Sequence, residues 1–407
     1  MRMVSIATAL PTLGWRFCCI VMSVYFLALL PTLFVKNFDP SVFIVAGDVF
    51  VDATKAASPI LIKHHSYGYD GQFYYRLAVS PLTFTRSAFG VTMDSPPAWR
   101  TQRIGYPIAA WALSFGQARW VPVALVLVNL VALGAVAWFS AQLTAKLRLS
   151  GWIPILIVIW PGFIYTLTRD TTEILAAALM LAALNSYFGE RLFLYLVLAA
   201  GASLTRETSI LVFGGIFLFE AFRFCRDPKL TARGLVPMLI TASVVLPFLA
   251  WRYAQLYLWG ELPTTRDLGF PLAGIFEALR YSIAGVVFSS SSTDALTTDL
   301  QFISAVSLVF IIIFGCTVAS CLRSEAFARK AGLVNGWILI SVLVISLRAD
   351  GPFIGPHAFL RALTEWYVVG CLLLPAEIPA AMVSYLRAGV VLIWLTAWTV
   401  SFLQVVA

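Results

Sequence analysis

The chain has 407 residues, of which 60% are hydrophobic and 12% are charged, and its mean hydropathy is +0.88. Too few polar side chains are present to cover a water-soluble particle of this size, which excludes a soluble globular protein. The formal net charge of +8 indicates no nucleic-acid partner. Most of the basic residues fall in short loops between apolar stretches, where anionic lipid headgroups attract them.

The first apolar stretch runs from Phe17 to Val35 and follows Arg2 and Arg16. Its basic flank is typical of a signal peptide, but the stretch is long, and no small-residue cleavage site follows it before Lys36. We interpret it as the first transmembrane helix.

Further apolar stretches recur along the whole chain, and a helix needs about 20 such residues to cross a bilayer. They predict an all-α integral membrane protein with about eleven transmembrane helices, in a range of about ten to thirteen. The whole chain, 1–407, is expected to form a single polytopic transmembrane domain. After the first span, the predicted spans are 120–143, 152–168, 172–188, 191–204, 207–224, 234–258, 300–322, 332–348, 363–383 and 388–406.

The orientation of the chain follows from its basic residues, because short loops rich in Lys and Arg stay in the cytoplasm. With the N-terminus inside, alternation puts every such loop on the cytoplasmic side, provided that 103–116, RIGYPIAAWALSFG, does not cross the membrane. We therefore predict that 103–116 is a helix lying at, or dipping into, the outer surface. The basic residues placed inside are Lys146, Arg148, Arg191, Arg223, Arg226, Lys229, Arg233, Arg323, Arg329, Lys330 and Arg387.

Two regions are predicted to lie outside: a first external loop at 36–119 that carries interfacial helices, and a second external loop at 259–299. The second contains an apolar piece at 271–289, for which both a loop and a membrane-inserted position stay open. Neither loop contains a cysteine, so no disulfide framework is expected. The six cysteines are Cys18, Cys19, Cys225, Cys316, Cys321 and Cys371.

The first external loop concentrates charge in a chain that otherwise has little, which suggests a site. Within it, Asp70 opens a short amphipathic helix at 69–78, YDGQFYYRLA, which we expect to lie flat on the membrane. The alternative is that Asp70 only caps this helix by accepting backbone N–H bonds. The carboxylates and histidines gathered in the loop are Asp48, Asp52, His64, His65, Asp70 and Asp94.

More charged residues occur where one apolar run gives way to the next, and the predicted orientation puts them all on the external side. Ionisable residues at membrane depth are costly, so they usually pair with one another and face a cavity rather than lipid. Purely structural ion pairs are the alternative to a functional cavity, and the shared external side favours the cavity. These residues are Arg169, Asp170, Glu173, Arg206, Glu207, Arg348, Asp350, His357, Arg361 and Glu365.

An external cavity lined by arginines suits an anionic lipid whose phosphate lies at the interface, because the planar guanidinium matches phosphate oxygens. A carboxylate close to an acceptor hydroxyl can act as general base while the arginines stabilise a departing phosphate. The residues alone therefore predict an anionic-lipid site with a candidate base.

Four features resemble those of GT-C-type glycosyltransferases, which are polytopic membrane enzymes that use polyprenyl- or dolichyl-phosphate sugars as donors. A large external loop directly follows the first predicted helix. Tyr-Asp-Gly-x-x-Tyr-Tyr at 69–75 and Arg-Ile-Gly-Tyr-Pro at 103–107 are similar in order and spacing to the Trp-Asp-x-x-x-Tyr and Phe-Pro-Leu-Tyr-Pro elements of GPI-anchor mannosyltransferases. Arg-Asp-x-x-Glu at 169–173 occupies the place of an Arg-Gly-Asn-x-Glu element. Tyr69 and Asp170 stand where those patterns have Trp and Gly.

The resemblance implies a membrane glycosyltransferase, similar to a mannosyltransferase, that moves a hexosyl group from a polyprenyl-phosphate sugar to a glycan, lipid or protein acceptor. Transfer is expected to invert the sugar and to need neither metal nor cofactor. A loop aspartate serves as general base in the resembling enzymes; Asp70 is our first choice for this role and Asp48 the second. The residues expected to bind substrate or its phosphate are Tyr74, Arg103, Tyr106, Arg169, Glu173, Arg206, Glu207, His357 and Arg361.

Other chemistries are less well supported by the sequence. Neighbouring residues on a regular element point apart, and no further ligands accompany His64 and His65, so they do not indicate a metal site. No glycine-rich phosphate loop, nucleophile elbow or His-Glu-x-x-His helix is found. A multi-pass transporter or flippase for lipid-linked sugars is the main alternative, although no convincing internal repeat supports it. A non-catalytic assembly partner is the third.

The short, loop-poor build favours a bacterial inner membrane, with membrane lipids as neighbours and the active site on the periplasmic side. A cavity open on one side favours the transferase, whereas a path that reaches both faces favours the transporter.

Overall fold

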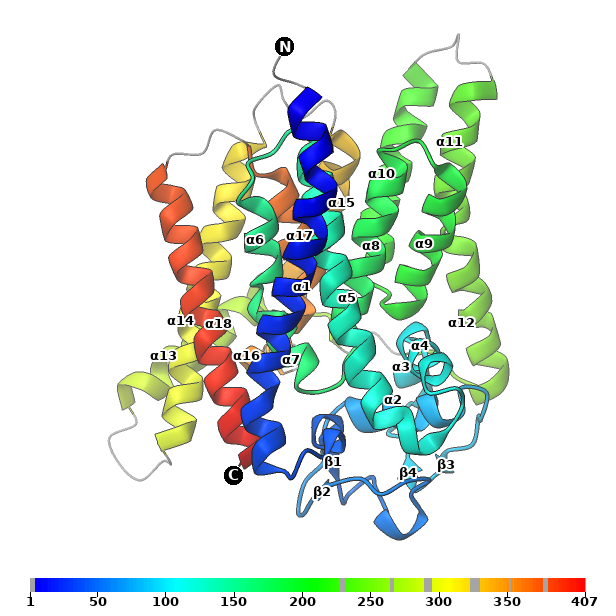
Figure 1. The fold of residues 1–407 in the computed structure, drawn as a ribbon, viewed down its shortest axis with the longest axis vertical. Coiled ribbons are helices and arrows are strands. Elements are labelled where there is room, and N and C mark those ends of the chain that lie inside the picture. Colours follow the sequence, from blue (N-terminus) through cyan, green and yellow to red (C-terminus); the bar gives the residue numbers. More distant parts are fainter. Residues whose placement is uncertain are drawn as a thin grey trace.

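The computed structural model describes residues 4–226, 232–263, 267–288, 295–322, 330–350, 353, 355–375 and 380–406. Its regular structure is almost entirely α-helical, and most of the helices stand side by side in one bundle (Figure 1). Three of the basic residues used to orient the chain, Lys229, Arg323 and Arg329, lie outside the described residues, as do 376–379 of the predicted span 363–383 and the last residue of the apolar piece 271–289.

Five described helical stretches are long and apolar enough to cross a membrane: Gly14–Val35, Ala118–Lys146, Leu235–Trp259, Gln301–Cys321 and Val383–Leu403. They belong to α1 (Val4–Val35), α5 (Val121–Lys146), the consecutive helices α11 (Ala232–Ser243) and α12 (Val245–Trp259), α14 (Ala295–Cys321) and α18 (Ala380–Val406). The predicted α-helical architecture is confirmed, and the length and composition of these five stretches support a multi-pass membrane protein.

Two predicted spans are each divided into shorter helices. The run 152–168 forms α6 (Ile153–Val158) and α7 (Pro161–Leu167), because Pro161 has no backbone N–H with which to continue α6. At 363–383, α17 (Thr364–Leu373) ends after ten residues, and 380–383 already belong to α18. A separate short helix, α16 (Pro356–Ala362), precedes the span. The prediction of one continuous helix was wrong at both places. The number of complete crossings stays a prediction.

The other helices of the bundle are intermediate in length. The apolar piece at 271–289 forms a helix, α13, of sixteen residues. These helices are α8 (Glu173–Tyr187), α9 (Leu192–Thr205), α10 (Ser209–Arg226), α13 (Ala273–Phe288) and α15 (Ala331–Ile345).

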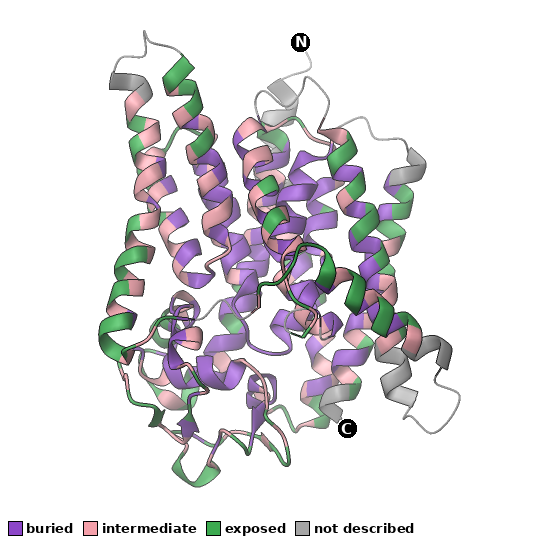
Figure 2. Ribbon diagram, turned by 180° about the vertical axis from the view of Figure 1, so that it is seen from behind, coloured by how far each residue is buried: buried purple, intermediate pink, exposed green. Residues whose placement is uncertain are grey.

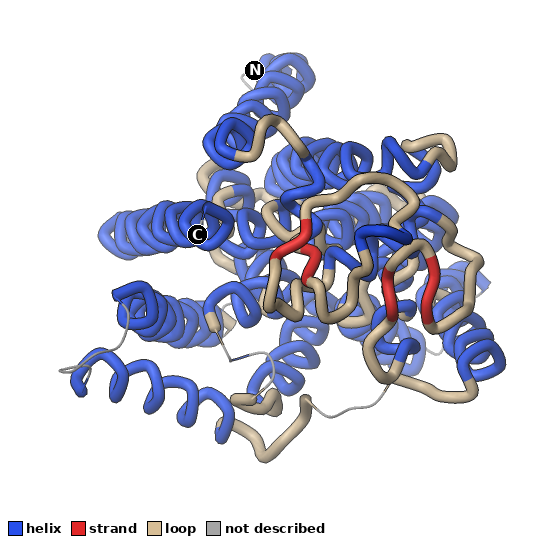
Figure 3. The backbone as a smooth tube through the Cα atoms, turned by 90° about the horizontal axis from the view of Figure 1, so that it is seen from below, coloured by secondary structure: helices blue, strands red, loops and turns tan. Residues whose placement is uncertain are grey.

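The first external loop folds against the end of the bundle opposite to where α1 begins (Figure 1). Two small sheets brace it, as Figure 3 shows from below: β1 (Ala46–Gly47) runs parallel to β2 (Ile62–Lys63), and β3 (Ser87–Ala88) runs antiparallel to β4 (Val91–Thr92). The short helices of the loop are η1 (Pro40–Ile44), η2 (Ala53–Lys55), α2 (Gly71–Val79), α3 (Pro97–Thr101), α4 (Gly105–Leu113) and η3 (Ala118–Trp120).

The sequence predicted that helix α2 lies flat on the membrane surface. This prediction was wrong, because the helix is buried inside the protein. Residues 71–78 are all buried, and their aromatic rings pack with side chains of α4 and α5 in a core of their own. Burial of large aromatic rings inside the protein contributes more to stability than contact with a surface does. Apolar side chains are exposed instead on α4 and just after it, at Ile108, Trp111 and Phe115. With nine residues, α4 is too short to cross a bilayer.

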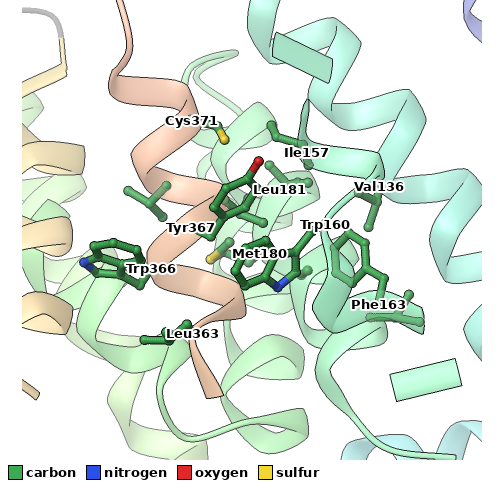
Figure 4. Close-up of a cluster of buried hydrophobic side chains, with 14 of the residues drawn as sticks. Val136, Ile157, Trp160, Phe163, Met180, Leu181, Leu363, Trp366, Tyr367 and Cys371 are labelled. Atoms are coloured by element: carbon green, nitrogen blue, oxygen red, sulfur yellow. The ribbon is translucent and has the colours of Figure 1, made fainter. Parts of the chain in front are cut away.

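The middle of the bundle is a continuous buried core (Figure 2). Within it, the indole ring of Trp160 stacks on Tyr367 with 4.0 Å between ring centroids (Figure 4). The same indole donates its Nε1–H to the carbonyl oxygen of Leu360 at 3.1 Å. This pair of contacts ties α16 and α17 to the start of α7, and so fixes α16 close to the external loop.

Two glycines bring α10 and α15 into close contact. A Cβ atom added to Gly215 would lie 2.0 Å from the backbone nitrogen of Gly336, so no larger residue fits there without movement of the backbone. The close approach sets α15 beside the connector between α9 and α10, which carries Arg206 and Glu207.

Candidate functional site

Asp70 lies at the start of α2, but its carboxylate does not cap that helix. No backbone N–H of α2 reaches the side chain. Instead Oδ1 accepts a hydrogen bond from Nη1 of Arg100 at 2.7 Å, and Oδ2 accepts one from Nη2 of Arg361 at 3.4 Å. Burial alone would raise the pKa of Asp70, but the charges of Arg100, Arg361 and Arg103 outweigh it and lower this pKa to about 2. The carboxylate is therefore ionised at neutral pH.

Arg100, on α3, is a member of this site that sequence reasoning missed. Its Nε and Nη2 both donate to Oδ2 of Asp94, at 2.9 and 2.7 Å, and its guanidinium lies over the ring of Phe73 at 4.9 Å. Pro96 and Pro97 mark the start of α3 in the sequence, but no spacing or periodicity singles out Arg100 within it. Two carboxylates thus share one arginine.

Arg361, on α16, joins the external loop to the bundle. Besides Asp70, its Nη1 lies 3.6 Å from Oε1 of Glu173, and its guanidinium lies over the ring of Tyr69 at 4.7 Å. Glu173 also accepts a hydrogen bond from the Thr166 hydroxyl at 3.2 Å. The structure therefore brings Asp70, Glu173 and Arg361 together.

Arg206 lies near the site, and its side chain also binds the end of α16. Its Nη1 donates to Oε2 of Glu365 at 2.8 Å and to the carbonyl oxygen of Arg361 at 2.9 Å, and its Nη2 donates to the carbonyl oxygen of Ala362 at 3.2 Å. These bonds hold the last turn of α16, and with it the backbone that carries the Arg361 side chain.

Arg103 and Glu207 form a bidentate ion pair, with Nε and Nη2 of the arginine 3.0 and 2.7 Å from the two carboxylate oxygens. Burial raises the pKa of Glu207, but the neighbouring Arg103 outweighs it and lowers this pKa to about 2. The side chains of Arg103 and Glu207 remain 13% and 26% exposed, so this arginine is more accessible to a ligand than Arg206, whose side chain is 4% exposed.

The other predicted binding residues surround this network at different depths. Arg169 donates to the Thr168 hydroxyl at 3.1 Å and lies over the rings of Tyr69 and Tyr165, at 5.5 and 5.1 Å. Tyr106 is fully buried, and its hydroxyl donates to the carbonyl oxygen of Leu125. Tyr74 is equally buried and packs edge-on against Tyr106 at 6.0 Å between ring centroids. The ring contact between Tyr74 and Tyr106 thus packs α2 against α4.

His357 stands at the start of α16, with its ring 5.7 Å from that of Tyr69 and 6.3 Å from that of Tyr165. Among the described residues, its buried Nδ1 has no hydrogen-bond partner. Burial, followed by the charges of Arg169 and Arg361, lowers the pKa of His357 to about 3. The imidazole is therefore neutral and has a polar atom available to a ligand.

Asp170 does not join the network of hydrogen bonds and ion pairs around Asp70, although Glu173, three residues later, belongs to it. Its backbone is in the left-handed region, with φ at 45°, and its fully buried carboxyl oxygens meet no hydrogen-bond donor in the described part of the chain. Burial raises the pKa of Asp170 well above its usual range.

Asp48, the second candidate base, shapes the loop instead of joining the arginines. Its two oxygens accept hydrogen bonds from the backbone N–H groups of His65 and Ser66, at 2.9 and 3.1 Å, and His64 lies 3.5 Å away. No hydrogen bond or ion pair links it to Asp70 in the described ranges. Those ranges also contain no group of three His, Cys, Asp or Glu side chains that could hold a metal ion.

Two cavities adjoin the network. The first, which we call the arginine cavity, has a volume of 250 Å³. Its charged lining residues are Arg103, Arg206, Glu207, Arg252 and Asp267. Another wall is apolar and consists of Ile340, Leu343 and Val344 of α15 and Leu347 just after that helix.

The second cavity, which we call the α13–α14 cavity, has a volume of 490 Å³ and lies between α13, α14 and the start of α16. Its polar lining residues are Glu277, Tyr281, Ser282, Gln301, Ser304, Asp350 and His357. Both cavities are formed by residues at the end of the bundle where the external loop folds (Figure 1).

Comparison of the chain with family models, curated proteins and solved structures found no match.

Proposed function

We propose that the protein is a membrane glycosyltransferase of the GT-C type, which moves a hexosyl group from a polyprenyl-phosphate sugar to a glycan, lipid or protein acceptor. The observation that carries the proposal is the position of Asp70. An ionised, largely buried carboxylate lies between two arginines, beside a cavity that joins further arginines to an apolar wall. In this proposal the chain crosses a bacterial inner membrane about eleven times and the site faces the periplasm.

The arginine cavity has the two properties that a lipid phosphate requires. Arg103 and Arg252 line it with guanidinium groups, which match phosphate oxygens in charge and geometry. The aliphatic face of α15 on another side suits the first isoprene units of a lipid chain, because their burial there removes apolar surface from water. A soluble sugar nucleotide would have no use for that apolar wall.

The proposed transfer uses Asp70 as the base. A hydroxyl oxygen of the acceptor attacks the anomeric carbon of the donor sugar, and the bond from that carbon to the phosphate oxygen breaks. Polyprenyl phosphate leaves with the electron pair, and the hydroxyl proton passes to a carboxylate oxygen of Asp70. A single displacement of this kind inverts the anomeric carbon.

The arginines that lower the pKa of Asp70 also make it a weak base while they bind it. An incoming phosphate competes for the same guanidinium groups, of which that of Arg103 lines the arginine cavity. Donor binding therefore loosens their interaction with Asp70 and raises its proton affinity when the acceptor arrives. The same arginines then stabilise the phosphate as it departs.

The test uses the purified full chain in lipid nanodiscs with a panel of polyprenyl-phosphate hexoses. We expect at least one of them to raise the melting temperature in a concentration-dependent way, because a ligand that binds only the folded state stabilises it. The same donor should yield free polyprenyl phosphate and a glycosylated product when acceptors are added. Stabilisation without product, together with movement of the lipid across a sealed vesicle, would support the transporter instead.

A further inference from the structure

The two cavities lie on either side of α16 and differ in charge. His357, at the start of α16, lines the α13–α14 cavity, and Ala362, at its end, lines the arginine cavity. Between them Arg361 binds Asp70. The seven residues of α16 span about 10 Å, so the two cavities lie near opposite ends of the short helix whose Arg361 binds Asp70.

The α13–α14 cavity does not suit an anion. The described residues that line it include the carboxylates Glu277 and Asp350 but neither lysine nor arginine. Asp350 is already paired with Arg348 at 2.7 Å. An incoming phosphate would therefore meet negative charge and no cation in the wall, in contrast to the arginine cavity.

The same lining suits an uncharged group that carries several hydroxyls. Tyr281, Ser282, Gln301 and Ser304 can each both donate and accept hydrogen bonds, as sugar hydroxyls do. The neutral imidazole of His357 adds a buried Nδ1 with no partner among the described residues. The volume of 490 Å³ is within the usual range for small-molecule sites, about 300 to 1,000 Å³.

We infer that the α13–α14 cavity binds the acceptor of the transfer, and that the acceptor presents an uncharged, hydroxyl-rich headgroup of the sugar class. This inference rests on the proposed function, since it needs a donor in the arginine cavity. His357 and Gln301 orient the acceptor, and one hydroxyl points past Tyr69 toward Asp70.

Photolabelling tests the inference without requiring turnover. The probe is glucosylglycerol carrying a diazirine, which is uncharged, and the protein is the full chain in nanodiscs. Labelled peptides are identified by mass spectrometry, with excess unmodified glucosylglycerol as competitor. We expect competed labelling at 277–282 or 301–304. Label at the arginine cavity, or label spread evenly over lipid-facing helices, would overturn the assignment.

Two variants define the site. Ala278→Trp fills the cavity from a buried position in its wall, and Gln301→Ala removes hydrogen-bonding groups without adding bulk, which keeps the test usable if the tryptophan variant does not fold. Each should lower competed labelling by about tenfold, equivalent to about 1.4 kcal/mol of binding free energy. Leu343→Trp, in the arginine cavity, is the matched control and should leave this labelling unchanged. Equal labelling in all three variants would contradict the inference.

A second probe separates this inference from the proposed function. Photoreactive polyprenyl phosphate should label the arginine cavity and should lose that label in Leu343→Trp. If the lipid phosphate fails to label while glucosylglycerol still labels 277–282 or 301–304, the proposed function fails and the sugar site remains. The reverse pattern overturns only the inference.

Discussion

Arg206 and Glu365 form an ion pair that is almost completely removed from solvent, with Nη1 2.8 Å from Oε2 and side-chain exposures of 4% and 1%. The pair links the connector between α9 and α10 to the first turn of α17. Because the same arginine binds two carbonyl oxygens at the end of α16, it fixes the segment that carries Arg361. Arg206 therefore affects the site by fixing the position of Arg361.

Replacing Arg206 by Met should destabilise the fold. The substitution leaves the Glu365 carboxylate buried without a partner, which typically costs about 3 to 5 kcal/mol, whereas Arg206→Met combined with Glu365→Met should recover much of the loss. Thermal and denaturant unfolding in detergent measure the change. Arg348→Met is the matched control, since its pair with Asp350 is about half exposed and worth less than about 1 kcal/mol. Equal destabilisation by both single variants would contradict this interpretation.

Arg103 offers the opposite case, an arginine that can exchange its partner for a ligand. Arg103→Lys keeps the charge but loses the fork that matches two phosphate oxygens, so donor affinity should fall by about tenfold while the melting temperature without donor stays close to wild type. Titration of the donor against intrinsic fluorescence measures it. Arg148→Lys, exposed at the other end of the bundle, should bind normally. Unchanged affinity in Arg103→Lys would assign this arginine to structure alone.

The stability of the protein should fall between about pH 4 and pH 2. The pKa values of Asp70 and Glu207 in the fold, each about 2, lie below the values near 4 of the unfolded chain. Such groups stabilise the fold above the unfolded pKa, and this stability is lost as pH falls through the folded pKa. Asp170 has the opposite sign, because its pKa is raised. Asp70→Asn should therefore flatten the acid limb of the melting temperature, and an unaltered limb would show that Asp70 is not paired in solution.

The helical, multi-pass character of the chain could be predicted from hydropathy, because apolar stretches longer than a bilayer is thick have few other uses. The breaks were harder to predict. Pro161 marks the break between α6 and α7 in the sequence. No such residue marks the separation of α16 from α17, which pack around Trp160 and Tyr367. The burial of α2 was also not predictable. A short helix that lies on a membrane and one that packs against α4 and α5 can have the same amphipathic sequence pattern.

The sequence indicated which types of residue gather at one end of the bundle. It did not indicate which of these residues form hydrogen bonds or ion pairs with one another. Asp70 and Arg361 are separated by 291 residues, and nothing local indicates their contact. Arg100 was missed because one arginine in a polar loop carries no periodic or spacing signal. Asp48 was the second choice for the base in sequence, and in the structure the hydrogen bonds from His65 and Ser66 distinguish it from Asp70.

The orientation of the protein can be tested by cysteine labelling. Thr85, in the external loop, and Ala145, in the last turn of α5 at the other end of the bundle, are both exposed. With the exposed native residues Cys19, Cys225 and Cys316 replaced by serine, Thr85→Cys should react with an impermeant maleimide added to intact spheroplasts. Ala145→Cys should react only after lysis. Labelling in the reverse order would invert the orientation inferred from the basic loops.

The general base is tested by Asp70→Asn. Asparagine preserves the size of the side chain but cannot take up the acceptor proton, so transfer should fall by about 10² to 10⁴ fold, the usual contribution of a positioned proton acceptor. The variant also loses two ion pairs, so its melting temperature and donor affinity are measured alongside turnover with a saturating donor. Because the neighbouring arginines then have one carboxylate fewer, donor affinity should stay level or rise. A loss of turnover that merely follows a loss of folded protein would instead assign Asp70 to structure.

Asp48→Asn is the matched control for this experiment. Its carboxylate is also an aspartate of the external loop, but it binds the backbone of His65 and Ser66, which one asparagine oxygen can still do in part. Turnover should therefore stay within a few fold of wild type, as is usual for a surface substitution away from the reacting atoms. Full activity in Asp70→Asn together with loss in Asp48→Asn would move the base to Asp48. Such a result would also require the loop to rearrange on substrate binding, because 65–66 hold the Asp48 oxygens outside the arginine network.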